Sequence, residues 1–193
     1  MTTYDSTTAL LVVDVQNDFA DPAGGLYVQG GEEVVRPAGV EVGAAHNAGA
    51  VVVYTQDWHP ATTPHFEKDG GVWPVHCVHD TWGAELHPDL LVQGPVVRKG
   101  TSGEDGYSAF SVRDPLSGAA ASTQLQSLLD PSVRRLVIVG LAGDYCVRET
   151  ALDGRRLGYD VEVPLALTRF VELTEGDTEQ AVAQMREAGV TLT

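Results

Sequence analysis

Cys146 is a candidate nucleophile in this sequence. It stands where an apolar run at 136–139 gives way to a helix-like segment at 145–157. Backbone N–H groups and the dipole at the start of a helix stabilise a thiolate, whereas an unperturbed thiol titrates at about 8.5. The position therefore predicts an activated thiol, and a small buried filler is the alternative interpretation.

Two charged side chains are candidates for proton transfer beside such a thiol. Asp14 ends the apolar run 9–13, where a partly desolvated carboxylate is costly unless paired and is a candidate base. Lys99, one of only two lysines in the chain, follows the short run 95–97, and its ammonium could hold a carboxylate and shift its proton affinity. A turn cap for Asp14 and an ordinary surface position for Lys99 are the alternatives.

Asp57 and His59 lie two residues apart, so on an extended segment their side chains point the same way. Five of the six histidines fall between residues 58 and 94, and His65 and His76 are the candidate partners of this pair. Carboxylate and imidazole ligands suit a divalent ion such as zinc, iron or manganese. The alternative is that histidines scattered over a loop form polar surface.

Three aromatic side chains near these segments are candidate walls for a flat ring: Phe19, Trp73 and Tyr107. Aromatic side chains are commoner in a core than in a pocket. Ordinary core packing is therefore the alternative interpretation of all three.

Short apolar runs that alternate with helix-like segments must position these residues. Continuous apolar runs are typical of strands buried on both faces, and they lie at 9–13, 50–54 and 136–139, with weaker ones at 95–97, 161–165 and 190–193. Helices are predicted at 32–47, 122–129, 145–157 and 177–188. The alternation predicts a mostly parallel sheet covered on both faces, with ligands bound at the carboxyl ends of its strands.

The composition narrows the class of protein. A length of 193 residues favours one domain over 1–193, with an irregular insertion at about 58–94. A net charge of −15 argues against a nucleic acid or an anionic membrane as main partner. Two cysteines, no signal peptide and no apolar run long enough to span a membrane favour a cytoplasmic protein with reduced thiols. The oligomeric state, including a homo-oligomer, stays open.

Five segments together resemble a known family. They are Asp14-Val-Gln-Asn-Asp-Phe19, Asp57-Trp-His59, Trp73-Pro-Val-His-Cys77, Lys99-Gly100 and Gly140-Leu-Ala-Gly-Asp-Tyr-Cys146. In order and spacing they resemble the cysteine hydrolases of the isochorismatase-like superfamily. The Asp-x-His pair with His76 is similar to the nicotinamidase (pyrazinamidase) branch of that superfamily.

The resemblance implies a three-layer α/β/α sandwich with a six-stranded, mostly parallel sheet. It also implies that Cys146 attacks the carboxamide of nicotinamide, while Asp14 takes the thiol proton and later delivers it to departing ammonia. Lys99 would hold Asp14, and the N–H groups of Ala142 and Cys146 would form the oxyanion hole. Water would then hydrolyse the thioester to nicotinate, a step of NAD salvage, and pyrazinamide would be a further substrate.

One divalent metal ion is a further implication of the resemblance, with zinc favoured over iron and manganese. Its ligands would be Asp57, His59 and His76, and His65 matches a fourth ligand in some members. The ion with its waters would hold the pyridine nitrogen of the substrate. The three aromatic side chains named above would sandwich the ring.

Two departures from the family keep alternatives open. Gly143 stands where the family usually carries Thr. A glycine at this position would loosen the turn at the oxyanion hole. Members also differ in length over 100–107, which affects the assignment of Tyr107. The alternatives are a related cysteine hydrolase acting on another amide or carbamoyl substrate, and a metal-binding protein with an inactive site.

Overall fold

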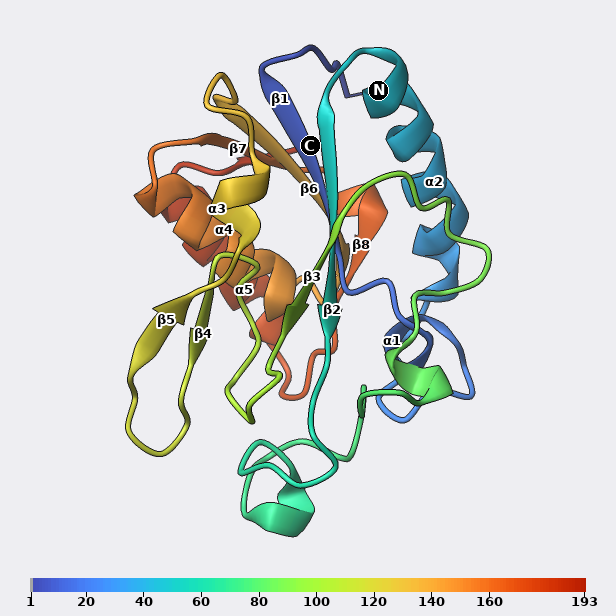
Figure 1. The fold of residues 1–193 in the computed structure, drawn as a ribbon, viewed down its shortest axis with the longest axis vertical. Helices are drawn as coiled ribbons and strands as arrows, with labels where there is room; N and C mark the ends of the chain where they lie inside the picture. Colours follow the sequence, from blue (N-terminus) through green and yellow to red (C-terminus); the bar gives the residue numbers. More distant parts are fainter. Residues whose placement is uncertain (1) are drawn as a thin grey trace.

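The computed structural model describes residues 2–193 as an α/β/α sandwich, with one twisted sheet between two layers of helices (Figure 1). Six strands follow the order β3-β2-β1-β6-β7-β9, and β8 adds a seventh by pairing with β6. The strands of this sheet pair in parallel. They are β1 (Thr8–Val13), β2 (Val51–Asp57), β3 (Val96–Lys99), β6 (Arg135–Leu141), β7 (Asp160–Val163), β8 (Thr168–Arg169) and β9 (Thr191–Leu192).

The mostly parallel sheet predicted from the sequence is confirmed, and each of the six apolar runs forms one of its strands. The expected number of six strands is one too low. β8 consists only of Thr168 and Arg169, which pair with Gly140 and Leu141 at the end of β6. Two polar residues have no apolar pattern from which a strand can be predicted.

Helices cover both faces of the sheet. α2 (Glu32–Asn47) packs on one face, and α4 (Cys146–Arg156) and α5 (Asp177–Glu187) lie on the other (Figure 1). The helix predicted at 122–129 is wrong in length, since α3 is a single turn at Leu125–Leu128. Residue 122 belongs to a strand, and the backbone is already extended at Leu129, close to a proline that disfavours helix in the residue before it.

The remaining elements are short. They are α1 (Asn17–Ala20), the 3₁₀ turns Glu67–Asp69, Trp82–Ala84 and Leu165–Leu167, and an antiparallel hairpin of β4 (Ser111–Arg113) and β5 (Ala120–Ser122). The hairpin and the loop after β2 project from the same end of the molecule (Figure 1). Over residues 2–193, none of the helices combines the length and the apolar character needed to cross a membrane.

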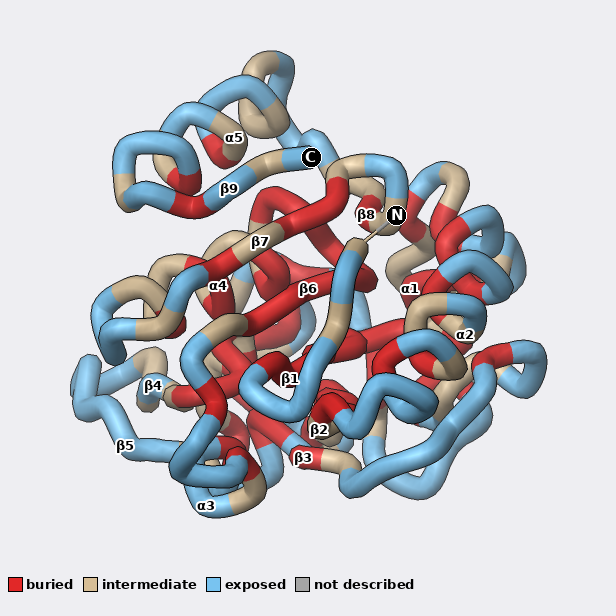
Figure 2. Tube along the Cα trace, turned by 90° about the horizontal axis from the view of Figure 1, so that it is seen from above, coloured by how far each residue is buried: buried red, intermediate tan, exposed pale blue. Residues whose placement is uncertain are grey.

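The core lies on both sides of β1, whose six residues are all buried (Figure 2). Alternate side chains of a strand point to opposite faces. Leu10 and Val12 accordingly join the apolar cluster beneath α2, while Leu11 and Val13 join the cluster beneath α4 and α5. Burial on both faces explains why the run at 9–13 is continuously apolar instead of alternating.

The carboxyl ends of the strands meet at one edge of the sheet, which is where a ligand site is expected in such folds. β1 turns away directly after Val13, because Asp14 takes the left-handed backbone conformation with φ of 49°. Beside it, Gly140 has φ of 119°, and a Cβ atom there would lie 2.1 Å from the carbonyl oxygen of Val13. Only glycine lets β6 pass this close to β1 as both strands reach the site.

Gly140→Ala is expected to lower the free energy of unfolding by at least about 2 kcal/mol. The positive φ is unfavourable for alanine, and the new methyl group would clash with the backbone of Val13. Urea denaturation measures the change. Gly43→Ala is the matched control, since Gly43 lies inside α2 with nothing within 4 Å of its added Cβ. That variant should gain about 0.5–1 kcal/mol from helix propensity alone. Equal stability of the two variants would contradict this account.

Candidate active site and metal centre

Asp14, Lys99 and Cys146 come together at the carboxyl edge of the sheet, from the ends of β1 and β3 and the start of α4. The Lys99 ammonium donates to Asp14 Oδ2 over 2.7 Å and lies 3.8 Å from Cys146 Sγ. The other oxygen of Asp14 accepts a hydrogen bond from the Thr55 hydroxyl over 2.6 Å. The three predicted residues therefore form one contiguous group with no exposed member.

Lys99 is a cation held inside the protein. Its side chain is fully buried, and its ammonium also donates to Asp57 Oδ1 and to the carbonyl oxygen of Gly106. Burial alone would lower the pKa of Lys99, but the carboxylates of Asp14 and Asp57 outweigh it and raise the pKa well above its usual value. Lys99 is therefore protonated throughout the neutral range.

Asp14 is tuned as a base. Burial raises the pKa of its carboxyl group to about 6, although the Lys99 ammonium opposes this rise. A carboxylate with a pKa in this range is largely ionised at neutral pH and still binds a proton readily. This combination suits a group that must both accept and return a proton.

Cys146 differs from the sequence-based expectation of a stabilised thiolate. It is the first residue of α4, as predicted, but burial raises the pKa of its thiol well above the ordinary value, and the nearby Asp14 and Asp57 add to the rise. The Lys99 ammonium lowers the pKa without cancelling these effects. The resting side chain is a thiol, so its activation requires a base, and Asp14 is the adjacent one.

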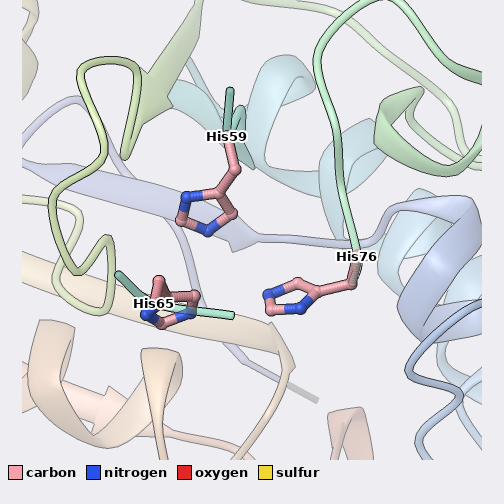
Figure 3. Close-up of side chains that lie close together, drawn as sticks. All are labelled: His59, His65 and His76. Atoms are coloured by element: carbon pink, nitrogen blue, oxygen red, sulfur yellow. The ribbon is translucent and has the colours of Figure 1, made fainter. Parts of the chain in front are cut away.

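Three buried imidazoles lie on the other side of Asp57. His59, His65 and His76 point toward one another (Figure 3), and one ring nitrogen from each lies within 4.8 Å of the others. Asp57 Oδ2 is 3.7 Å from His59 Nε2 and 4.0 Å from His76 Nε2. All four predicted metal ligands are thus brought together, including His65.

The donor set fits a divalent metal ion. Among residues 2–193, neither ring nitrogen of the fully buried His59 has a hydrogen-bond partner, which is costly unless another ligand is supplied. His76 donates from Nδ1 to the Pro74 carbonyl oxygen over 2.8 Å, so its Nε2 lone pair faces the cluster. Burial lowers the pKa of His76 to about 4, which keeps the ring neutral and able to bind a metal.

Asp57 joins the Asp14–Lys99–Cys146 group, called the proton-transfer group below, to the histidines. Burial would raise its pKa, but the Lys99 ammonium and the neighbouring imidazoles more than compensate and lower it. One oxygen meets Lys99, and the other faces His59 and His76. Asp57 therefore remains ionised and serves both halves of the site.

A cavity opens between the thiol and the histidines. It is lined by the predicted Phe19, Asp57, His65, Trp73, His76, Tyr107, Ala142 and Cys146, and by three residues that sequence reasoning missed, Leu26, Tyr145 and Val171. A groove of about 520 Å³ beside α3 contains none of the predicted site residues, and a groove of about 390 Å³ shares Tyr107 and Tyr145 with the site cavity. Tyr145 adjoins Cys146 in the sequence and could have been found, whereas Leu26 and Val171 lie in loops without any distinguishing pattern.

An aromatic wall closes one side of this cavity. The Trp73 indole N–H donates to the Tyr107 hydroxyl over 2.8 Å, and the Tyr145 ring meets Trp73 edge-on with centroids 4.7 Å apart. Phe19 lies at 5.4 Å from the His76 ring, measured between centroids. The structure thus places all three predicted aromatic residues, Tyr107 included, where they can contact a flat ligand.

Gln16 is a further site residue that the sequence did not reveal. Its buried side-chain amide accepts from the Asp57 N–H and donates to the Asp57 carbonyl oxygen, each over 2.8 Å. β1 has already turned away at Asp14, so this amide takes the place of backbone groups as the hydrogen-bond partner of the end of β2. Asp57 is therefore held by a side chain that makes the hydrogen bonds a neighbouring strand would make.

The turn at Gly143 is firmly held, contrary to the expectation that glycine loosens it. The Gly143 N–H donates to the Arg169 carbonyl oxygen over 2.7 Å, and a Cβ atom at Gly143 would lie 2.5 Å from the Phe170 ring. The neighbouring Asp144 carboxylate accepts from the N–H groups of Val171 and Glu172 over 3.0 and 2.8 Å. The Phe170 ring occupies the space that a side chain at position 143 would need.

The chain is similar to several known proteins over nearly its whole length. An isochorismatase domain matches residues 8–193. The nicotinamidase of Escherichia coli is 37% identical over 204 residues, which cover 95% of this chain and 93% of that protein. The structure of PnC1 from L. infantum in complex with nicotinate has a TM-score of 0.88 at 36% identity and covers 100% of this chain and 95% of that one. A pyrazinamidase of Pyrococcus horikoshii in complex with zinc has a TM-score of 0.83 at 33% identity, with coverages of 97% and 98%. The chain belongs to the isochorismatase family.

Lys99→Met is expected to lower the free energy of unfolding of the metal-free protein by about 3–5 kcal/mol, because it leaves two buried carboxylates without their cation. The double variant Lys99→Met/Asp14→Asn removes one of those charges and should recover part of the loss. Urea denaturation of both variants and the unaltered protein measures the difference. A double variant less stable than Lys99→Met would contradict the central role of this charge group.

Proposed function

We propose that this protein is a nicotinamidase, which hydrolyses the carboxamide of nicotinamide to nicotinate and ammonia. The observation that carries the proposal is the buried Asp14–Lys99–Cys146 group at the base of an aromatic cavity, with a histidine cluster beside it. Relatives named nicotinamidase support the substrate, and the L. infantum protein is described in complex with the expected product.

The first half of the reaction uses Asp14 as a base. Asp14 accepts the proton of the Cys146 thiol as the sulfur attacks the carboxamide carbon, and Lys99 stabilises the ionised Asp14 before this transfer. The tetrahedral intermediate carries an oxyanion, for which the N–H groups of Ala142 and Cys146 are the proposed donors. The Cys146 N–H is available because the first amides of a helix have no acceptor within it.

The second half returns every proton. Asp14 delivers its proton to the departing nitrogen, the C–N bond breaks, and ammonia leaves behind a thioester on Cys146. Asp14, ionised again, takes a proton from a water molecule that attacks the thioester carbon. The C–S bond then breaks, Asp14 returns this proton to the Cys146 sulfur, and the acid product loses the second water proton to solvent and leaves as nicotinate.

A divalent metal ion belongs to the proposal, with zinc favoured over iron and manganese. Asp57, His59 and His76 would hold it, with His65 as a fourth ligand. When bound, the ion and its waters supply a positive site for the pyridine nitrogen of the substrate. The aromatic wall then orients the ring, so that the carboxamide reaches Cys146.

The proposal also covers the setting of the reaction. The two cysteines, Cys77 and Cys146, are free, which suits a reducing compartment such as the cytoplasm. Nicotinate production would place the chain in NAD salvage, and pyrazinamide, another flat ring carboxamide, is a proposed second substrate. We further propose one domain over 1–193, with the segment at about 58–94 as the metal-binding insertion.

Purified, metal-loaded protein is expected to release ammonia from nicotinamide, and Cys146→Ala should lower kcat/KM by about 10⁴-fold or more, since it removes the nucleophile. Cys77→Ala is the matched control, because it removes the other buried thiol and should keep most of the activity. Ammonia release is followed in a coupled assay.

A panel of other amides and carbamoyl compounds accompanies this assay. Rejection of nicotinamide and pyrazinamide with turnover of another amide would replace the proposed substrate. No turnover of any compound by the metal-loaded protein would favour an inactive site.

The pH dependence tests the assigned base. Burial raises the pKa of Asp14 to about 6, and only the ionised form can accept the thiol proton, so kcat/KM should fall as the pH drops through about 6. Below this value each pH unit should cost roughly tenfold. Initial rates are measured with the metal content determined at each pH, which separates this effect from metal loss. An acid limb near pH 4, the ordinary carboxyl value, would contradict the assignment.

A further inference from the structure

His65 is paired with a carboxylate that belongs neither to the Asp14–Lys99–Cys146 group nor to the histidine cluster. Its Nδ1 lies 2.8 Å from Asp105 Oδ1, which comes 40 residues later in the chain. The His65 side chain is 4% exposed and that of Asp105 is 21% exposed. The pair is therefore largely shielded from water. In such surroundings a hydrogen bond between an imidazole and a carboxylate is strong and directional.

The backbone of Asp105 is held in place as well. Its N–H donates to the Arg113 carbonyl oxygen over 2.7 Å and its carbonyl oxygen accepts from the Arg113 N–H over 3.2 Å, so it pairs with β4. The next residue, Gly106, accepts a hydrogen bond from the Lys99 ammonium. The segment 105–106 is thus anchored to both the hairpin and the proton-transfer group.

This contact determines which nitrogen of His65 can bind a metal. Because the carboxylate accepts only, Nδ1 carries the hydrogen, and the Nε2 lone pair is the one left free for a metal. The His65 ring lies in the cluster with His59 and His76 (Figure 3). His76 is oriented by a backbone carbonyl, whereas His65 is oriented by a charged group. A carboxylate on the outer nitrogen also makes the imidazole a stronger ligand.

We propose that Asp105 is the positioning residue that makes His65 a ligand of the metal ion. The inference rests on the proposed metal site, but not on the identity of the substrate. Asp105 touches neither substrate nor ion, and it acts through the orientation and ligand strength of His65.

A second pair in the chain provides a matched control. His79 Nδ1 lies 2.8 Å from Asp80 Oδ2, the same contact at the same distance. These side chains are 46% and 81% exposed, and His79 does not belong to the buried cluster. Asp80→Ala therefore removes a side-chain hydrogen bond of the same length outside the buried cluster, while the backbone bond from the His79 N–H to the His59 carbonyl oxygen is left in place.

The experiment measures metal affinity instead of activity. The full-length protein and its variants are stripped, and their dissociation constants for Zn²⁺ are measured by competition with a chelator. Asp105→Ala should weaken binding about 10–100-fold, as the loss of a ligand's hydrogen-bond partner does at other metal sites. Asp105→Asn, which keeps an acceptor but loses the charge, should lie between Asp105→Ala and the unaltered protein. Asp80→Ala should bind as the unaltered protein does.

His65→Ala shows whether Asp105 acts through His65. In that background, Asp105→Ala should have no further effect on the dissociation constant, because its target is already gone. The visible spectrum of the Co²⁺-loaded protein should change in the same way for Asp105→Ala and His65→Ala, as both lose one nitrogen ligand. Circular dichroism and thermal melting confirm that each variant is folded.

Several outcomes would overturn the proposal. Unchanged affinity and an unchanged Co²⁺ spectrum in Asp105→Ala, with only a lower melting temperature, would reduce the contact to a structural one. An equal loss from Asp105→Ala with and without His65 would show that Asp105 acts elsewhere. Failure of the unaltered protein to bind Zn²⁺ or Co²⁺ would overturn this proposal and the metal part of the proposed function together. Normal metal binding without nicotinamide turnover would overturn only the proposed function.

Discussion

The site depends on one buried cation. The Lys99 ammonium lies between the carboxylates of Asp14 and Asp57, and its side chain has no contact with solvent. Two carboxylates this close could not both stay ionised in a water-free interior without it, and Lys99 itself would lose its proton without them. The charge group is therefore stable only when complete. Because one carboxylate faces the thiol and the other faces the histidines, a single cation supports both halves of the site.

The surrounding fold makes this group possible by bringing strand ends to one edge. Asp14, Asp57 and Lys99 each end or directly follow a neighbouring strand in the order β1, β2 and β3, so parallel pairing alone places them side by side. Cys146 arrives from the opposite side, at the start of the helix that follows β6. Burial raises the pKa of the Cys146 thiol as it raises that of the Asp14 carboxyl group.

The sequence predicts those features that leave a local pattern. Buried parallel strands leave continuous apolar runs, and reactive side chains stand out where such runs end, as Asp14 and Lys99 do. Features made by contacts between distant segments leave no such pattern. β8 has two residues, and Gln16 and Asp105 act through partners 41 and 40 residues away. The protonated state of Cys146 cannot be predicted from the sequence either, because it depends on complete burial and on charges that only the folded chain brings together.

The amide of Gln16 has a consequence for how such a site can change. The Gln16 amide oxygen accepts from the Asp57 N–H, and its NH₂ group donates to the carbonyl oxygens of Asp57 and Ala84, so the end of β2 keeps hydrogen-bond partners where β1 has left the sheet. The main chain of β1 leaves the sheet after Val13, and the end of β2 is still hydrogen-bonded. The path of the chain after Asp14 is therefore constrained at residue 16, because a shift of the Gln16 backbone would move the amide that holds Asp57.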